Sequence, residues 1–214
     1  MTTDRTEAQR PDAGRGHGTA ARVLHWATVV GLAVILPAGI AMTGEGFRSA
    51  SGALYVLHKG GGVIVLLLVV ARLIWKAGSP PVDPLPETVA PLERRWAAGT
   101  HALLYGLLLF MGFSGYARTV AGGFPIELLD VVGVPPLLPE MPGLAVTLSV
   151  LHSFAGYLLV AVVALHVGVV ARHAWVVRDG VPGRMWPPRA PRSSSPPVSG
   201  PEDGRGPGER EAVS

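Results

Sequence analysis

Two histidines lie in one of the most apolar stretches of the chain. His152 and His166 fall within residues 144–178, which are apolar enough to cross a membrane. On a helix their spacing gives about 21 Å of rise and about 3.9 turns, so both imidazoles point to one face, near opposite ends. Ionisable side chains inside a membrane are costly and usually face a partner in the bundle interior. We therefore expect this helix to bind something at two depths.

The rest of the chain supplies three more segments of the same kind. Of its 214 residues, 49% are apolar and 15% charged, and the mean hydropathy is +0.38. Apolar runs of about 20 residues match a hydrocarbon core of about 30 Å. The pattern predicts an all-α fold, an integral membrane four-helix bundle. Its helices are expected at residues 21–42, 53–75, 92–116 and 144–177.

The segments outside the spans divide the chain into three parts. Residues 1–19 and 181–214 lack hydrophobic periodicity and read as disordered tails around a domain at 20–180. The first apolar run is longer than the core of a usual signal peptide and follows a polar segment, so we expect it to remain as a membrane helix. The loop at 117–142 contains a possible short surface helix at 124–132.

Basic residues give the orientation. Fifteen Lys and Arg residues fall on the side of the two tails and the second loop, against three on the other side. The positive-inside rule then places both termini in the cytoplasm. The pI of about 9.7 comes from residues spread over tails and helix ends rather than gathered in one patch, which argues against nucleic acid as a partner.

With this topology each histidine has a predicted depth. His25 and His166 lie near the cytoplasmic side, while His58 and His152 lie near the outer surface. Two levels with a histidine pair at each match the requirement of two bis-histidine haems. His101 has a depth that matches His166 at least as well as that of His25, and spacing does not choose between them.

Histidine suits haem because one imidazole nitrogen binds iron while the other bonds an acceptor that fixes the tautomer. Two axial histidines close both positions on the iron and favour electron transfer over oxygen activation. The chain has no cysteine, which excludes disulfides, thiolate iron–sulfur ligation and c-type haem attachment. Gly61, Gly62 and Gly156 follow the outer histidines at helical spacing and would let a flat macrocycle approach.

Basic residues near the histidines are candidate partners of haem propionates. These are Arg22 and Arg172 on the inner side, with Lys59 and Arg48 on the outer side. Lys59 and Arg48, together with Arg118, are also candidates for steering an anionic donor. His173, at the cytoplasmic edge, is expected to have a surface or propionate role.

The combination of motifs resembles the bacterial cytochrome b561 family over residues 20–180. It consists of Arg22-x-x-His25-Trp26, His58, His101-x-x-x-Tyr105 and His152-x13-His166-x6-His173. The resemblance implies a bacterial inner-membrane cytochrome with two haem b groups and quinone as an electron partner. It pairs His25 with His166 and His58 with His152, and leaves His101 and His173 unligated.

Several activities are compatible with this resemblance. Similar proteins described as superoxide oxidases transfer the electron of superoxide to quinone, and others serve as membrane electron-transfer subunits that dock a separate redox enzyme. A small proton or metal transporter is the alternative from another class. It is less favoured, because the sequence places no Asp or Glu within the membrane interior for a relay and shows no inverted repeat. Small-residue faces are compatible with a homodimer.

Overall fold

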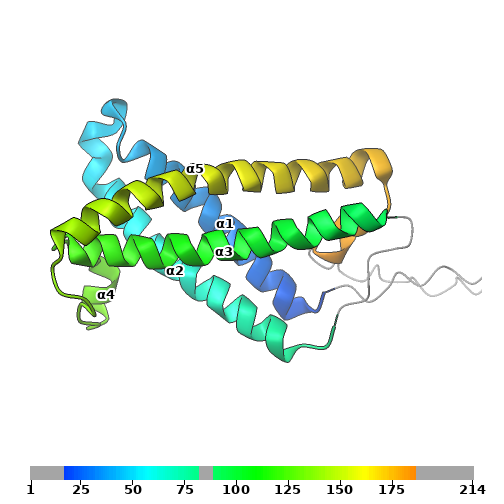
Figure 1. Ribbon diagram of the computed structural model, residues 1–214, viewed down its shortest axis with the longest axis horizontal. Coiled ribbons are helices and arrows are strands. Elements are labelled where there is room, and N and C mark those ends of the chain that lie inside the picture. The colour runs from blue at the N-terminus through cyan, green and yellow to red at the C-terminus, as the bar shows by residue number, and fades with distance from the viewer. Residues whose placement is uncertain (1–16, 82–88, 187–214) are drawn as a thin grey trace, which may run out of the picture.

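The computed structural model describes residues 17–81 and 89–186. Four long helices dominate it, two along its long axis and two oblique to it (Figure 1). They are α1 (Thr19–Ala41), α2 (Ser51–Gly78), α3 (Pro91–Ala121) and α5 (Pro142–Arg172). Each lies in a segment long and apolar enough to cross a membrane. The predicted all-α four-helix membrane architecture is confirmed, with helix ends that differ by a few residues from those expected.

Short helices occupy the two ends of the bundle. The 3₁₀ helix η1 (Glu45–Ala50) and the helix α4 (Glu127–Val131) lie at one end. At the other end, α5 continues into a π-helical turn, η2 (His173–Val177), and the chain then forms the 3₁₀ helix η3 (Val181–Arg184). The short helix predicted in the third loop is confirmed as α4.

Local chemistry explains where the helices begin and end. Proline occupies the first turn of both α3 and α5, where its missing N–H costs no hydrogen bond. Gly123 follows α3 with φ of 75°, a left-handed conformation that glycine adopts without steric cost. This residue turns the chain out of α3 toward α4.

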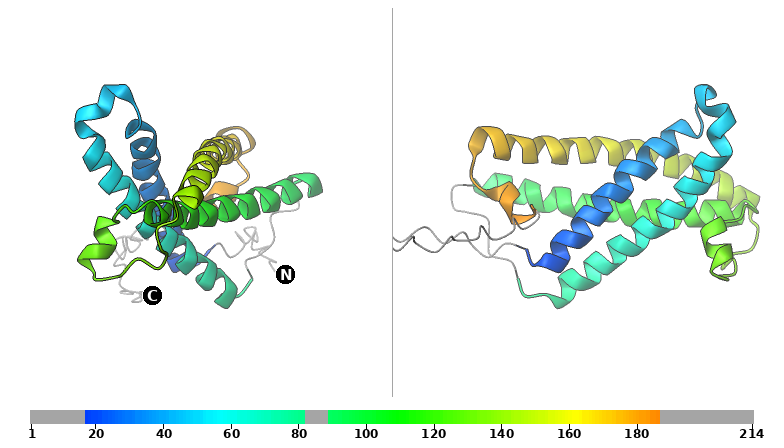
Figure 2. Two further views of the ribbon diagram at one scale, coloured as in Figure 1. Left: turned by 60° about the vertical axis from the view of Figure 1, so that its left-hand side comes forward. Right: turned by 180° about the vertical axis from the view of Figure 1, so that it is seen from behind.

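The four long helices pack as two pairs. Buried residues on α1 and α2 form one apolar cluster, made of Ile35, Val65 and Val69. Residues on α3 and α5 form the other, made of Leu107, Ala155, Leu159 and Val162. The two pairs diverge from one another (Figure 2), and among the long helices the contact between the pairs is mainly that of α2 with α3. This arrangement decides which helices can offer histidines to one shared space.

The structure describes only a part of each predicted tail. Residues 1–16, 82–88 and 187–214 lie outside them. The expectation of a disordered tail from residue 181 is wrong for residues 181–186, because η3 forms there. Trp186 lies edge-on to Trp26 of α1 with ring centroids 5.6 Å apart, and the indole N–H of Trp26 donates to the Met185 carbonyl at 2.9 Å.

Candidate functional site

A histidine pair lies near the end of the bundle that carries η1 and α4. His58 on α2 and His152 on α5 have ring centroids 6.2 Å apart at an interplanar angle of 89°. A metal–imidazole bond is about 2 Å long and the ring centre lies about 1 Å beyond the nitrogen, so two rings on opposite sides of one metal have centroids about 6 Å apart. The separation of these rings fits ligation of a shared iron.

Hydrogen bonds place both rings in the tautomer that a metal requires. The Nδ1–H of His58 donates to the Ile35 carbonyl at 2.8 Å, which leaves the Nε2 lone pair free. Nδ1 of His152 lies 2.9 Å from the Ser114 hydroxyl oxygen, and that hydroxyl itself donates to the Met111 carbonyl. With its own proton on Met111, the Ser114 hydroxyl can accept an Nδ1 proton of His152, an arrangement that leaves Nε2 of His152 for a metal. Second partners of this kind orient metal-binding imidazoles.

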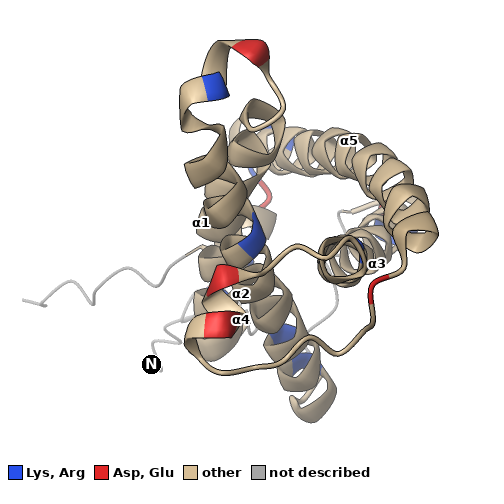
Figure 3. Ribbon diagram, turned by 90° about the vertical axis from the view of Figure 1, so that its left-hand side faces the viewer, with Lys and Arg blue, Asp and Glu red and all other residues tan. Residues whose placement is uncertain are grey.

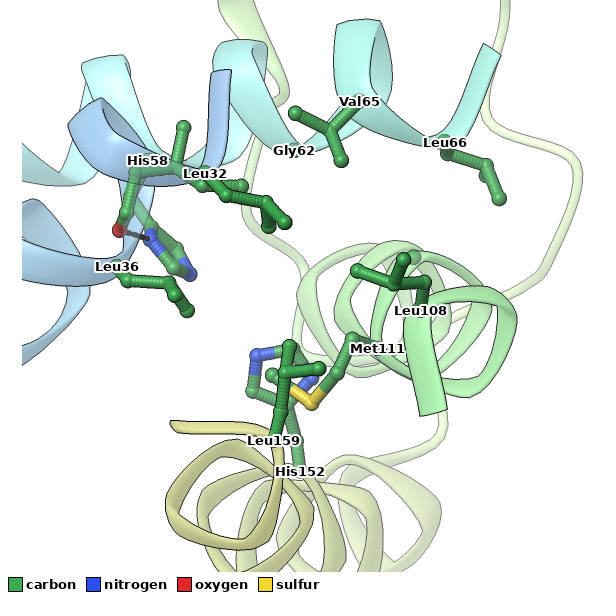
Figure 4. A pocket seen from close by; sticks show the side chains of 12 residues that line it. Leu32, Leu36, His58, Gly62, Val65, Leu66, Leu108, Met111, His152 and Leu159 are labelled. Atoms are coloured by element: carbon green, nitrogen blue, oxygen red, sulfur yellow. Dashed lines mark hydrogen bonds between the residues drawn. The ribbon is translucent and has the colours of Figure 1, made fainter. Parts of the chain in front are cut away.

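The space between the two rings is apolar (Figure 4). Besides the two histidines, the cavity is lined by Leu32, Ile35, Leu36, Gly62, Val65, Leu66, Leu108, Met111, Gly112 and Leu159. Its volume is about 40 Å³, far less than a porphyrin occupies, so haem binding requires the lining side chains to move outward. The donor set and the apolar lining fit a haem, whose porphyrin supplies the other four iron ligands.

The glycines near this pair have different roles from those expected. A Cβ on Gly61 would meet Ile35 of α1 at 2.5 Å, so Gly61 allows α1 and α2 to approach. Gly62 has open space beside it, as expected for a residue facing a macrocycle, and a Cβ on Gly156 would meet Met111 at 3.4 Å. The glycines that touch the histidines are Gly39 and Gly115, which sequence spacing did not identify.

Gly39→Ala is expected to weaken binding at the His58–His152 pair. The new Cβ would lie 2.6 Å from Cε1 of His58, so the ring has to move out of its position. Overpacking of this kind costs about 1–3 kcal/mol, which corresponds to a loss of affinity for the bound group of roughly five- to 160-fold. Haem per polypeptide measures the effect. Gly106→Ala is the matched control, because a Cβ there meets nothing within 4 Å; an equal loss in both variants would contradict the role of Gly39.

Three histidines gather at the opposite end of the bundle. His101 on α3 and His166 on α5 have ring centroids 5.4 Å apart at 76°. His101 donates its Nδ1–H to the Ala97 carbonyl at 2.7 Å, which leaves its Nε2 free. His25 on α1 lies within electrostatic range of both. The predicted partners His25 and His166 thus share one end, and the ring beside His166 is that of His101.

His25 differs from the other histidines in its hydrogen bond. A guanidinium N–H of Arg72 on α2 donates to Nδ1 of His25 at 2.8 Å. Because this nitrogen accepts, the proton of a neutral His25 lies on Nε2. Arg72 was not among the residues selected from the sequence, since its position at the end of a span read only as a topology signal.

The basic residues expected to bind propionates differ in whether they already have an acidic partner. Lys59 donates to Glu127 at 2.8 Å and to the Pro125 carbonyl at 2.6 Å. Arg172 lies 3.7 Å from Glu93, and Arg48 lies 3.8 Å from Glu45. The Nε of Arg22, by contrast, is buried with no hydrogen-bond partner among the described residues. Of this set, Arg22 is the one whose surroundings call for an additional acceptor.

His173 is not a surface residue. It is buried, and its Nδ1 lies 2.6 Å from a carboxylate oxygen of Asp179. The other carboxylate oxygen of Asp179 accepts from the backbone N–H of Val181 at 3.1 Å. His173 therefore fixes the turn that leads from α5 into η3.

Lys59 joins α4 to α2, and the acidic residues of α4 lie beside α2 (Figure 3). The hydrogen bond from Lys59 lowers the pKa of Glu127 below its ordinary value. A lowered carboxyl pKa means that the contact stabilises the fold above the ordinary glutamate pKa and is lost as pH falls through the lowered one. The contact thus holds α4 in place at neutral pH.

Glu127→Gln is expected to destabilise the protein by less than about 1 kcal/mol at neutral pH, as for a partly exposed ion pair. The difference from the wild type should shrink below about pH 4, the ordinary range of a glutamate. Thermal unfolding in detergent at both pH values measures it. The control is Glu45→Gln, whose pair with Arg48 is almost fully exposed. A difference that grows on acidification would contradict the assignment.

The described residues contain no group of three or more His, Asp or Glu side chains able to hold a metal ion by themselves. The histidines instead occur at two ends of one bundle, two at one end and three at the other, so each end has at least the two that a porphyrin-bound iron requires. This arrangement suits haem better than a bare metal ion.

Comparison with known proteins agrees with the geometry. A family model described as prokaryotic cytochrome b561 matches residues 16–188. The chain is also 32% identical over 129 residues to "Cytochrome b561 homolog 2" of Escherichia coli (strain K12), which covers 60% of this chain and 68% of that protein. The chain belongs to the prokaryotic cytochrome b561 family and is a multi-pass membrane protein of the haem b electron-transfer class.

Proposed function

We propose that the chain holds two haem b groups and transfers electrons across the bacterial inner membrane to or from the quinone pool. His58 and His152 are the proposed ligands of the outer haem, and His25 and His166 those of the inner haem. The observation that supports this most directly is the 6.2 Å separation of the His58 and His152 rings, each of which has a hydrogen-bond partner at Nδ1. Both termini are proposed to lie in the cytoplasm, as the basic residues predict.

The two haems would supply one-electron carriers at two depths of the bilayer. The protein's contribution is to hold the imidazoles, to keep water from the outer site through an apolar lining, and to provide cationic groups at the inner end. α5 supplies one proposed ligand at each level, and the rise between them is about 21 Å. This helix is therefore the element that fixes the distance between the two sites.

Superoxide as the outer donor is a proposal with weaker support. Of the candidate steering residues, Lys59 and Arg48 each lie beside a glutamate, which reduces the net positive field that an approaching anion meets. A redox protein that docks on the outer loop is the second candidate. In its favour, that loop and the end of α3 border an open cavity of about 450 Å³, lined in part by Tyr116, Phe124, Asp130 and Glu140.

Purified full-length protein tests these proposals. Two b haems per polypeptide, reduction by quinol and reoxidation by quinone are expected. Reduction by superoxide would favour the oxidase activity, whereas a co-purifying dehydrogenase together with no intrinsic activity would favour the docking subunit. Absence of haem from folded protein that was supplied with haem would exclude the cytochrome function, and transport assays would follow.

A further inference from the structure

Arg72 occupies an unusual position at the inner end of α2. Its side chain is half-buried between α1 and α3. One guanidinium N–H donates to His25 on α1 at 2.8 Å, and the guanidinium carbon lies 5.4 Å from the ring centroid of Tyr105 on α3. Arg72 thus links the two helix pairs at the level of the inner histidines.

Neither contact provides Arg72 with a negatively charged partner. A neutral imidazole and an aromatic face stabilise a guanidinium only in part, and a charged side chain within a membrane span is normally paired. The carboxylates described at this end are engaged elsewhere, Glu93 beside Arg172 at 3.7 Å and Asp179 beside His173 at 2.6 Å. Arg72 therefore lacks an anionic partner within the described part of the chain.

A second arginine at this end, Arg22, also has an unsatisfied guanidinium group among the described residues. Arg22 lies one turn before His25 on α1, and its Nε is buried without an acceptor in the described structure. The positive charges at this end also act on His17, which lies outside the membrane span. Its pKa is lowered first by burial and then by the charges of Arg184, Arg72 and Arg22. Positive charge converges here, where it favours binding of an anion.

We propose that Arg72 and Arg22 form a carboxylate-binding site that takes a propionate of the inner haem, with Arg72 as its principal residue. The proposal rests on the haem-binding function proposed above. Arginine suits this role because its planar donors match a carboxylate. A carboxylate that takes the Arg72 donor also releases Nδ1 of His25, which can then carry the proton and leave Nε2 to bind iron.

Haem retention tests the proposal. The full-length chain is reconstituted with haem b or with its dimethyl ester, which has no carboxylate, and loss of each haem to excess apomyoglobin is followed. The inner haem is identified by its absence in His166→Ala. Arg72→Gln is expected to lose inner haem b about tenfold faster than the wild type, in line with one charge-assisted hydrogen bond. With the ester, the two proteins should lose it at equal rates.

Two further variants make the result specific. Arg72→Lys keeps the charge but not the planar fork, and is expected to give an intermediate rate. Lys76→Gln is the matched control, because Lys76 also lies 5.4 Å from the Tyr105 ring and should leave the rate unchanged. Equal acceleration with haem b and ester in Arg72→Gln, or no acceleration, would overturn the proposal. A wild type that binds no haem would instead overturn the proposed function, and this inference with it.

Discussion

Replacing His58 or His152 with alanine is expected to lower haem content from two per polypeptide to one. Each substitution removes one iron ligand from a pair whose rings are 6.2 Å apart, and no other histidine of the described chain makes a ring contact with either of them. The remaining haem should keep its spectrum and midpoint potential, because the inner ligand His166 lies about 21 Å from His152 along α5.

The measurement is haem per polypeptide, together with reduced-minus-oxidised spectra and a redox titration. His17→Ala is a suitable control, since His17 precedes α1 and its backbone N–H bonds the Arg184 carbonyl. Retention of two haems in both His58→Ala and His152→Ala would contradict the assignment. Loss of both haems with an unchanged helical content would show instead that the two sites depend on one another.

The features of this fold that depend on depth could be predicted from the sequence. Apolar run length gave the four spans, and the stretch 124–132 in the third loop was predicted as the short helix that the structure shows as α4. The position of His58 after the first loop and of His152 after the third predicted that they share a level, and the structure brings their rings together. Depth follows from helical rise alone and needs no knowledge of neighbouring helices.

Features that depend on which helix faces lie together could not be predicted. Gly39 and Gly115 touch His58 and His152 from α1 and α3, and nothing in the local sequence of either glycine indicates that neighbour. The bond from Arg72 to His25 likewise requires the relative rotation of α1 and α2. The turn from Asp179 to Trp186 was missed because proline and glycine suggested disorder, although Trp186 and Asp179 both find partners.

The second ligand of the inner haem, which pairs with His166, has two candidates, His25 and His101. His166→Ala is expected to remove the inner haem in either case, so the comparison is between His25→Ala and His101→Ala. We expect His25→Ala to lose one haem and His101→Ala to lose none. Haem per polypeptide and low-spin ferric electron paramagnetic resonance signals distinguish the two outcomes.

Two observations favour His101 as the partner of His166. Its ring is 5.4 Å from that of His166, and its Nδ1–H already bonds a carbonyl, which leaves Nε2 free. His25, by contrast, has Nδ1 occupied by Arg72 and has to exchange that bond before it can ligate. Loss of a haem from His101→Ala and retention of both in His25→Ala would establish the His101–His166 pair and contradict our expectation.

The packing of the helices favours His25. α3 and α5 pack directly against one another through Leu107, Ala155 and Leu159, so a macrocycle held between His101 and His166 would have to separate a close-packed pair. Loss of such packing costs several kcal/mol. His25 belongs to the α1/α2 pair and His166 to the α3/α5 pair, as do His58 and His152 respectively. Haem at both levels would then lie between the same two pairs, where α1 and α2 each supply one ligand and α5 supplies two.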